Sequence, residues 1–450
     1  MPDKPELFGT DGIRGVAGHY PLDPATIRKI GSALGTVLKK SASPVRVVVG
    51  RDTRESSEWI SRALGSGLAA SGAEVVDAGV ITTPGVAFLT RRHGFSAGAM
   101  VSASHNPYQD NGIKVFASGG TKLPEAEELE IERRLATLPE LPEDNSDAAQ
   151  FAPTFVDDYV AYLESLVPSE SALSRFRLVL DCANGAASRV APLLTERLGM
   201  TAHFLNTEPN GRNINLNCGS LHPERMAETT RALGADLGVA FDGDADRAIF
   251  ATTEGRLANG DHVLYAMAPY LHRRAQLRGR AVVGTLMTNL ALELALAEQD
   301  IGLKRTAVGD KYVLEEMLRS GISLGGEPSG HIIFGDLSLA GDGLLTLLEV
   351  LRLLADSQRP LAHFLRGFEP FPQLIRNVRV REKLPLESIP SVAQAIEQCR
   401  SAVGERGRVV VRYSGTEPLA RVMVEAADAE VVANHAARIA GAIDAALGVR

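Results

Sequence analysis

Short runs of β-branched and other apolar residues alternate with longer segments of helical periodicity along most of the chain, and this alternation limits the fold more than any other feature. It is typical of sheets whose parallel strands are joined by helical crossovers. The first round predicts strands over 45–49, 74–78 and 97–101 and a helix over 57–71. We therefore expect an α/β architecture in this part of the chain.

The same rhythm returns twice further along. Strands predicted over 177–181 and 236–241 enclose a helix near 187–198, and a strand over 281–283 precedes a helix over 289–299. No fixed short period underlies these rounds, which excludes a solenoid. Three α/β blocks are therefore expected.

The last part of the chain departs from this pattern. Residues 373–450 are predicted to contain strands over 374–380, 408–412 and 420–425, a helix over 390–402 and an alanine-rich final helix. Strands and helices in these proportions predict a smaller α+β unit.

Length and loop composition together set the domain count. At roughly 150 residues per domain, a chain of 450 residues suggests about three domains. Connections rich in proline, acids or turn-forming residues lie at 138–147, 253–255 and 368–372. They divide the chain into four predicted domains: α/β domains over 1–152, 153–254 and 255–368, and an α+β domain over 369–450.

Charge and cysteine content exclude several classes of protein. Lys and Arg number 47 against 55 Asp and Glu, so the formal charge of −8 argues against a nucleic-acid partner. Cys182, Cys218 and Cys399 are too few and too far apart for a disulfide framework or a thiolate zinc site. The first residues carry no basic region followed by an apolar run, and polar residues interrupt the most apolar stretch, 281–297. We expect a cytoplasmic protein without a membrane partner.

Three aspartates at alternate positions follow the strand predicted over 236–241. Asp242, Asp244 and Asp246 offer the oxygen ligands that hard divalent cations prefer. An EF-hand is excluded, because its sixth position would be Arg247 and its twelfth Thr253. The incomplete ligand set suits a magnesium ion shared with a phosphate oxygen. The alternative is a solvated acidic turn.

Serines follow another predicted strand, over 97–101. The run Ser102-Ala103-Ser104-His105-Asn106-Pro107 turns sharply at Asn-Pro and places hydroxyls at a strand's carboxyl end, where open α/β sheets bind ligands. The sequence is not Gly-x-Ser-x-Gly, so a hydrolase nucleophile elbow is unsupported. A serine-capped turn is an equal alternative to a catalytic serine. Lys114 would supply a cation beside such a hydroxyl, unless it is a surface lysine.

Near the carboxyl terminus, arginines flank a glycine turn rich in hydroxyls. Arg412, Ser414, Gly415, Thr416 and Arg421 would offer a phosphate two guanidinium groups, two hydroxyls and backbone N–H groups. The spacing is not that of a Walker motif, so a nucleoside triphosphate is not implied. A turn with incidental arginines is the alternative.

A glycine-bracketed loop precedes the strand predicted over 332–334. Glu327 and Ser329 suit polyol hydroxyls or an amine, and His331 can move a proton near neutral pH. A purely structural loop is equally open. Arg14, in the run of residues 8–15, is another candidate contact for a phosphate group.

Taken together, these loops resemble the motifs of the α-D-phosphohexomutases, in the order found in that family and over essentially the whole chain. The resemblance rests on four loops: 102–107, 242–247, 326–331 and 412–416. It implies three similar α/β domains with mixed sheets and a smaller C-terminal α+β domain around a central cleft.

Within that family, the chain is most similar to the bacterial phosphoglucosamine mutases. That similarity draws on residues 8–15, 213–220, 222–224 and 309–313. Pro328 departs from their pattern, because those enzymes usually have glutamine between the glutamate and the serine. Phosphomannomutase and phosphoglucomutase activities therefore stay open as alternatives.

The resemblance implies a phosphoserine mechanism. Ser104 would carry a phosphoryl group, donate it to glucosamine 6-phosphate to give a 1,6-bisphosphate, and recover the other phosphoryl group after the intermediate reorients. The product, glucosamine 1-phosphate, would supply UDP-N-acetylglucosamine and cell-wall synthesis. One Mg²⁺ per subunit would bind to the three aspartates and to phosphorylated Ser104, with a hexose 1,6-bisphosphate as activator and intermediate.

It also implies roles for the remaining candidates. Lys114 and Arg247 would add positive charge, His105 would align the phosphoserine, and His331 would transfer a proton at the sugar hydroxyl. Contacts to the sugar and to its distal phosphate would come from a further set: Glu327, Ser329, Arg412, Ser414, Gly415, Thr416 and Arg421.

Two other functions remain open on the sequence. One is a phosphatase that uses Ser104 as its nucleophile, and the other is a sugar-phosphate-binding regulator without turnover. A phosphate-only loop far from the serine favours the mutase over the phosphatase. The sequence does not fix the preferred hexose or the oligomeric state, and a homodimer stays open.

Overall fold

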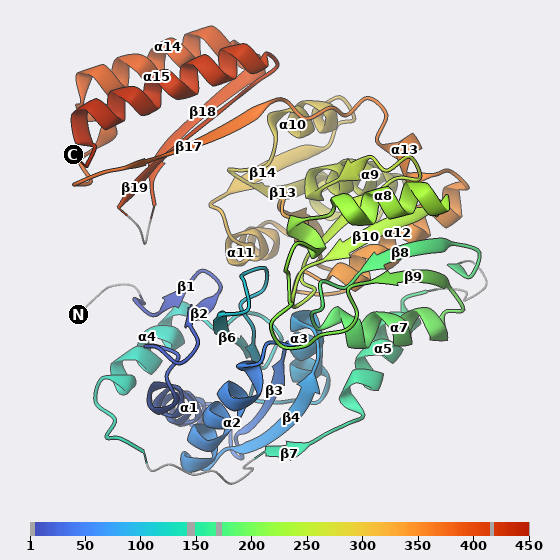
Figure 1. Ribbon diagram of the computed structural model, residues 1–450, viewed down its shortest axis with the longest axis vertical. Coiled ribbons are helices and arrows are strands. Elements are labelled where there is room, and N and C mark those ends of the chain that lie inside the picture. The colour runs from blue at the N-terminus through green and yellow to red at the C-terminus, as the bar shows by residue number, and fades with distance from the viewer. Residues whose placement is uncertain (1–4, 142–148, 168–172, 415–417, 450) are drawn as a thin grey trace. The chain divides into compact units, whose positions relative to one another are not determined.

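The computed structural model describes residues 5–141, 149–167, 173–414 and 418–449 (Figure 1). The chain forms two compact units. The first extends to Thr285 and resumes from Thr306 to Arg366, and the second comprises Leu286–Arg305 and the chain from Gly367 onward. In the described residues, no helix has the length and apolarity needed to cross a bilayer.

A seven-stranded mixed sheet begins the first unit, with strand order β1-β2-β6-β5-β3-β4-β7. Its central strands β5, β3 and β4 are parallel, as the crossover pattern predicts, whereas β6 and β2 run antiparallel to their neighbours. The strands are β1 (Phe8–Gly9), β2 (Gly12–Val16), β3 (Arg46–Arg51), β4 (Glu74–Val80), β5 (Ala97–Val101), β6 (Asp110–Ala117) and β7 (Ala149–Phe151). The helices are α1 (Pro24–Leu38), α2 (Ser57–Ala70), α3 (Thr83–Arg92) and α4 (Glu125–Leu135). The strands and the helix predicted over 45–101 are confirmed.

Two glycines let α1 and α2 pack backbone against backbone. A Cβ at Gly31 would lie 2.3 Å from the carbonyl oxygen of Leu64, and one at Gly67 would lie 2.0 Å from that of Arg28. Any side chain at either position would separate the helices. This close packing anchors α2, whose first residues lie beside the serine loop.

A second, five-stranded sheet follows, with strand order β12-β11-β10-β8-β9. Its strands are β8 (Arg177–Asp181), β9 (Thr201–Leu205), β10 (Leu237–Phe241), β11 (Ala248–Ala251) and β12 (Leu257–Ala258), and its helices are α5 (Phe155–Ser165), α7 (Ala187–Arg197) and α8 (Glu224–Leu233). β8 lies parallel to β9 and β10, and β11 lies antiparallel to β10. The turn at 253–255 joins β11 to β12, so this sheet continues past the boundary predicted at 254.

The third α/β region completes the first unit. β13 (Ala281–Thr285) and β15 (Leu324–Gly326) are parallel, and β16 (Ile332–Phe334) pairs antiparallel with β15. The helices are α9 (Gly260–Arg273), α11 (Asp310–Ser320), α12 (Gly343–Ser357) and the short α13 (Leu361–Phe364).

Short 3₁₀ turns occur in several parts of the chain, at η1 (Gly219–Leu221), η2 (Arg278–Arg280), η3 (Leu386–Ser388) and η4 (Gly404–Arg406).

The second unit is built on a three-stranded antiparallel sheet ordered β17-β19-β18, with two helices side by side against it (Figure 1). Its elements are α10 (Leu290–Ala297), β14 (Gly302–Thr306, of which Thr306 belongs to the first unit), β17 (Gln373–Arg379), α14 (Pro390–Val403), β18 (Gly407–Tyr413), β19 (Leu419–Ala426) and α15 (Ala429–Leu447). The α+β prediction for this region is confirmed.

A buried carboxylate explains why residues 286–305 group with this unit. Glu425 is fully buried and accepts hydrogen bonds from the backbone N–H of Leu290, from Gln373 Nε2 at 3.1 Å and from Arg408 at 2.7 Å. The first turn of α10 is therefore tied to the C-terminal sheet. Residues 286–305 also fall within the third domain predicted from the sequence, 255–368.

Asp342 caps α12 and gives a testable pH dependence. Its carboxylate accepts from the N–H of Leu345 at 2.9 Å and from the hydroxyl of Tyr159 at 2.7 Å, and burial raises the pKa of Asp342 to about 6. The folded protein therefore holds this proton more tightly than the unfolded chain, so stability falls as pH rises from about 4 to about 6 and stays lower above that range.

Asp342→Asn removes the charge, keeps one oxygen to accept from the N–H of Leu345, and offers an amide that can donate to the Tyr159 hydroxyl oxygen. A rise in pKa from 3.8 to about 6 corresponds to roughly 3 kcal/mol at most. We expect the variant to unfold only slightly above the wild type at pH 4.5 and at a clearly higher temperature at pH 7.5. Thermal unfolding at both pH values checks this. A difference that does not depend on pH would contradict it.

Candidate active site

The carboxyl ends of β5 and β10 bring the serine loop and the acidic loop together. Ser104 lies three residues beyond β5 and Asp242 directly follows β10. The Ser104 hydroxyl donates to Asp242 Oδ2 at 2.6 Å, and both side chains are fully buried. Two residues 138 positions apart thus form one site.

The three aspartates form a buried cluster that fits a divalent cation. One carboxylate oxygen from each of Asp242, Asp244 and Asp246 lies within 4.8 Å of the others, and each residue is at most 4 % exposed. Burial and the neighbouring charges of Asp246 and Asp244 raise the pKa of Asp242 well above its usual value. Among the described residues, Asp244 Oδ1 and Asp246 Oδ1 are buried without a hydrogen-bond partner. Oxygen ligands with unmet charge are the donors a hard cation prefers.

Lys114 partly offsets this negative charge from the adjacent strand β6. Its ammonium group lies 2.8 Å from Asp244 Oδ2, 3.1 Å from Asp246 Oδ2 and 3.2 Å from Asp11, and the side chain is 2 % exposed. Burial lowers the pKa of Lys114, but the three neighbouring carboxylates outweigh burial and raise this pKa well above its usual value. Thr83 also donates to Asp244 Oδ2. With their Oδ2 atoms bound, Asp244 and Asp246 keep their Oδ1 atoms for a cation.

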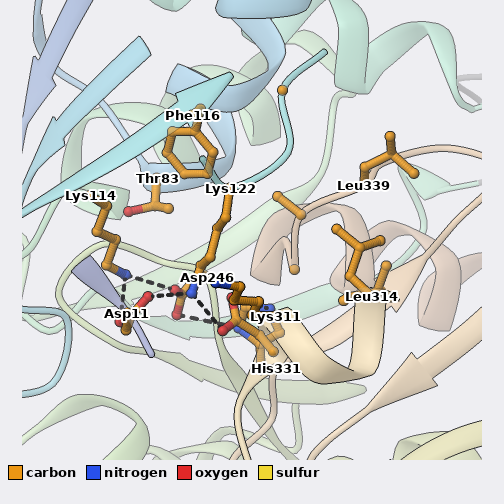
Figure 2. Close-up of a pocket in the computed structure, with 15 residues that line it drawn as sticks. Asp11, Thr83, Lys114, Phe116, Lys122, Asp246, Lys311, Leu314, His331 and Leu339 are labelled. Atoms are coloured by element: carbon orange, nitrogen blue, oxygen red, sulfur yellow. Dashed lines mark hydrogen bonds and ion pairs between the residues drawn. The ribbon is translucent and has the colours of Figure 1, made fainter. Parts of the chain in front are cut away.

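Further ion pairs surround a small cavity of about 20 Å³ next to the cluster (Figure 2). Lys122 pairs with Asp11 at 2.8 Å and with Asp310 at 2.6 Å, and so joins the first α/β region to the third. Lys311 lies on the same wall as His331. The cavity therefore brings the ammonium groups of Lys114, Lys122 and Lys311 together with Asp246 of the aspartate cluster.

His331 faces both acidic groups of this cavity. Its Nδ1 lies 3.8 Å from Asp246 Oδ1 and its Nε2 lies 3.7 Å from Asp310 Oδ2. Burial acts against protonation, but Asp246, Asp310 and Glu327 together raise the pKa of His331 to about 9. The imidazole is therefore protonated at neutral pH.

The neighbouring loop presents the two residues predicted to contact a sugar. The N–H of Gly309 donates to Glu327 Oε1 at 3.1 Å, and burial raises the pKa of Glu327. The hydroxyl of Ser329 is buried without a hydrogen-bond partner in the described part of the chain. A ligand hydroxyl or amine would satisfy both groups.

Basic side chains and one histidine lie near the serine. Arg247 Nε is 4.0 Å from Asp242 and 3.8 Å from Asp246, and Arg14 pairs with Asp11. His105 Nδ1 lies 3.2 Å from the Ser104 hydroxyl oxygen. Burial, Arg247 and Arg14 lower the pKa of His105 to about 4, so this imidazole is neutral at physiological pH.

The second unit carries the predicted phosphate loop. Arg412 and Arg421 are directly opposed on β18 and β19, and burial together with the charge of Arg421 lowers the pKa of Arg412. Ser414 is buried, and its carbonyl oxygen accepts from Lys383 at 2.7 Å. Like charges directly opposite each other on paired strands repel. Gly415 and Thr416 lie outside the described residues.

Several residues that contact the site were not singled out from the sequence. They are Asp11, Asp52, Arg54, Thr83, Lys122, Asn215 and Asp310. Asp52 and Arg54 directly follow β3, so the strand-end argument that selected Ser104 could have selected them as well. Thr83 and Asp310 begin helices α3 and α11 and the others lie outside helices, and only the tertiary structure reveals the partners of all of them.

Four family models match consecutive parts of the chain and settle its relationship. They are described as alpha/beta/alpha domains I, II and III and the C-terminal domain of phosphoglucomutase/phosphomannomutase, and they match residues 5–141, 157–255, 259–371 and 376–442. The chain belongs to the phosphoglucomutase/phosphomannomutase family. The predicted fold class of three α/β domains and a distinct C-terminal domain is confirmed.

Other members of this family are similar to the chain over nearly its full length. A phosphoglucosamine mutase of Koribacter versatilis is 51% identical over 460 residues, covering 99% of each chain. A solved phosphoglucomutase/phosphomannomutase family protein of Burkholderia thailandensis has a TM-score of 0.80 at 26% identity and covers 98% of this chain and 99% of its own. The N-acetylphosphoglucosamine mutase of Aspergillus fumigatus, solved with GlcNAc-6P and magnesium, shares the fold at 20% identity, with a TM-score of 0.70 and coverage of 100% and 97%.

Proposed function

We propose that the protein interconverts glucosamine 6-phosphate and glucosamine 1-phosphate through phosphorylated Ser104 and a 1,6-bisphosphate intermediate. The observation that carries this proposal is the 2.6 Å contact between the Ser104 hydroxyl and Asp242 within the buried aspartate cluster. The choice of hexose follows the phosphoglucosamine mutase of Koribacter versatilis, which shares 51% of its residues with this chain.

The transfer itself exchanges one phosphate ester for another. The bond between phosphorus and the serine oxygen breaks as a sugar hydroxyl oxygen bonds to phosphorus. The hydroxyl proton passes to a base, and the serine oxygen takes up a proton to restore the hydroxyl group. Asp242, Asp244 and Asp246 would hold a Mg²⁺ ion, whose charge would stabilise the transferring phosphoryl group. Lys114 and Arg247 add fixed positive charge on either side of the cluster.

His331 is the proposed proton-transfer residue. A cation bound by Asp246 would compete with the imidazolium for that carboxylate and so lower the pKa of His331 from about 9 toward the value a base needs. His105, neutral beside the Ser104 oxygen, and Arg14 would orient the phosphoserine. Glu327 and Ser329 would bind the sugar hydroxyls and amine.

The distal phosphate needs its own binding residues, because it must stay bound while the other phosphate reacts. We assign this role to Arg412, Ser414, Gly415, Thr416 and Arg421, which places one functional loop in each of the four predicted domains: 1–152, 153–254, 255–368 and 369–450. The opposed Arg412 and Arg421 support this assignment. The product would feed UDP-N-acetylglucosamine and cell-wall synthesis in the cytoplasm.

The decisive assay supplies glucosamine 6-phosphate, a trace of glucose 1,6-bisphosphate and Mg²⁺ to the purified protein. We expect glucosamine 1-phosphate, with kcat/KM exceeding that for mannose and glucose 6-phosphates by roughly tenfold to a hundredfold. Free phosphate as the product would instead indicate the phosphatase, and binding without turnover would indicate the regulator. A higher kcat/KM for mannose or glucose phosphate would show that the loop containing Pro328 selects those substrates. Light scattering on the same preparation measures the molecular mass in solution and so tests whether the protein forms a homodimer.

A further inference from the structure

The backbone of Ser104 is held in a conformation that serine rarely adopts. Its φ is +53°, in the left-handed region, which is strained for a residue other than glycine. Such a conformation persists only where the surrounding structure imposes it. The N–H of Ser104 donates to Ser102 Oγ at 2.9 Å, which restrains one side of the residue.

Arg54 restrains the other side through the carbonyl groups of the loop. Its Nη2 donates to the carbonyl oxygens of Ser104 and Asn106, each at 2.9 Å. Its Nη1 donates to those of Pro107 and, at 3.0 Å, Asp110. With Nε bound to Asp52, all five guanidinium N–H groups are used. No other side chain could reach four carbonyl groups from one planar fork.

Asp52 connects the two sides of the serine. Its Oδ2 accepts from Arg54 Nε at 2.8 Å and from Ser102 Oγ at 2.6 Å, and the Ser102 hydroxyl oxygen in turn receives the N–H of Ser104. The side chains of Asp52 and Arg54 are both fully buried. The N–H and the carbonyl group of Ser104 are therefore tied to one rigid ion pair at the end of β3.

Asn215 reaches the same carbonyl groups from the second α/β region. Its Nδ2 donates to the carbonyl oxygens of Ser104 at 2.9 Å and Asn106 at 3.1 Å, although it lies more than a hundred residues away in sequence. The acidic loop also meets this point, since a Cβ at Gly243 would lie 2.5 Å from the Ser104 carbonyl oxygen. Three separate segments thus converge on the carbonyl group of the reacting residue.

We propose that Arg54 and Asn215 are positioning residues that fix the Ser104 backbone so that its side-chain oxygen stays directed at the aspartate cluster throughout the reaction. The proposal rests on the proposed function. A phosphoryl donor must hold one position while the bisphosphate reverses its orientation, because an error of about 1 Å costs on the order of a hundredfold in rate. A role in stability alone would not require a donor from each of two α/β regions at the same carbonyl group.

The variant Asn215→Gly tests the contribution of the second region. Glycine tolerates the φ of +57° at this position and removes only the two hydrogen bonds. Asn217→Gly is the matched control, because Asn217 lies two residues further along the same loop, has a φ of +52° and is exposed. We expect kcat to fall at least tenfold for Asn215→Gly with KM within about twofold of the wild type, and both parameters to be unchanged for Asn217→Gly.

Arg54→Lys tests the fork itself, because an ammonium group keeps the charge but cannot bind four carbonyl groups in one plane. We expect a larger loss of kcat than for Asn215→Gly. If this variant does not fold, Asn215→Gly alone decides. A kcat equal to that of the wild type, or a loss confined to KM or to the unfolding temperature, would overturn the proposal.

A measurement independent of the hexose separates this proposal from the proposed function. The rate at which glucose 1,6-bisphosphate phosphorylates Ser104 is followed by intact-protein mass spectrometry, with each variant compared at equal concentrations of folded protein. A slower rate in Asn215→Gly supports positioning even if the preferred sugar is not glucosamine. A wild-type protein that accepts no phosphoryl group would overturn both proposals, whereas equal rates in the wild type and the variant would overturn positioning only.

Discussion

Replacing Ser104 with alanine is expected to abolish mutase turnover, with a loss of roughly 10⁴-fold to 10⁶-fold in kcat. The reason is that the proposed reaction passes through a covalent ester on the oxygen atom that this substitution removes. Water cannot replace it, because it would release free phosphate instead of passing the group between two sugar oxygens. Binding of the sugar phosphate should change little, since the proposed sugar and distal-phosphate contacts lie on other loops.

Intact-protein mass spectrometry checks this directly. Wild-type protein incubated with glucose 1,6-bisphosphate should gain one phosphoryl group, and Ser104→Ala should gain none. Ser102→Ala is the matched control, because Ser102 is a buried serine of the same loop whose hydroxyl is bound to Asp52. It should still be phosphorylated, at a lower rate. Phosphorylation of Ser104→Ala at the wild-type level would assign the reacting oxygen to another residue.

The sequence alone was sufficient for much of the fold, because its signals are local. The strand predicted over 97–101 coincides with β5, and the strand predicted over 177–181 coincides with β8. In both, an apolar run ends at turn-forming residues. The same reasoning placed Ser104 and Asp242 at the carboxyl ends of strands, where a ligand site is expected. The sequence pattern of a strand does not give the distance between two side chains. The 2.6 Å contact between Ser104 and Asp242 is therefore known only from the structure.

Contacts between distant segments account for what the sequence could not predict. Lys114 was expected beside a serine hydroxyl, and the structure places its ammonium group among Asp11, Asp244 and Asp246. Asn215 lies in a motif that indicated the subfamily without indicating any role. Its hydrogen bonds to the serine loop depend on how two sheets meet, and no local pattern encodes that arrangement.

Replacing Asp242 with asparagine is expected to have opposite effects on stability and on activity. Asparagine can accept from the N–H of Arg247 through its oxygen and donate to the Ser104 hydroxyl through its amide, so both present contacts keep a partner. The substitution also removes a buried charge that Asp244 and Asp246 repel. Because the pKa of Asp242 is raised in the folded protein, the wild type loses stability as pH rises, and the variant does not. At pH 7.5 and without Mg²⁺, its unfolding temperature should be about 2–4 °C higher.

Activity should change in the other direction, because the charge that destabilises the cation-free protein is the one that would bind the cation. We expect kcat to fall by roughly 10²-fold to 10³-fold and Mg²⁺ to lose most of its stabilising effect on the folded protein. Asp342→Asn is the matched control: it also removes a buried carboxylate of raised pKa and should also be stabilised at pH 7.5, yet Asp342 lies outside the aspartate cluster. It should keep its activity within about twofold and its full response to Mg²⁺. Equal responses of the two variants to Mg²⁺ would show that removing any buried charge nearby has this effect, and would count against a cation site at Asp242.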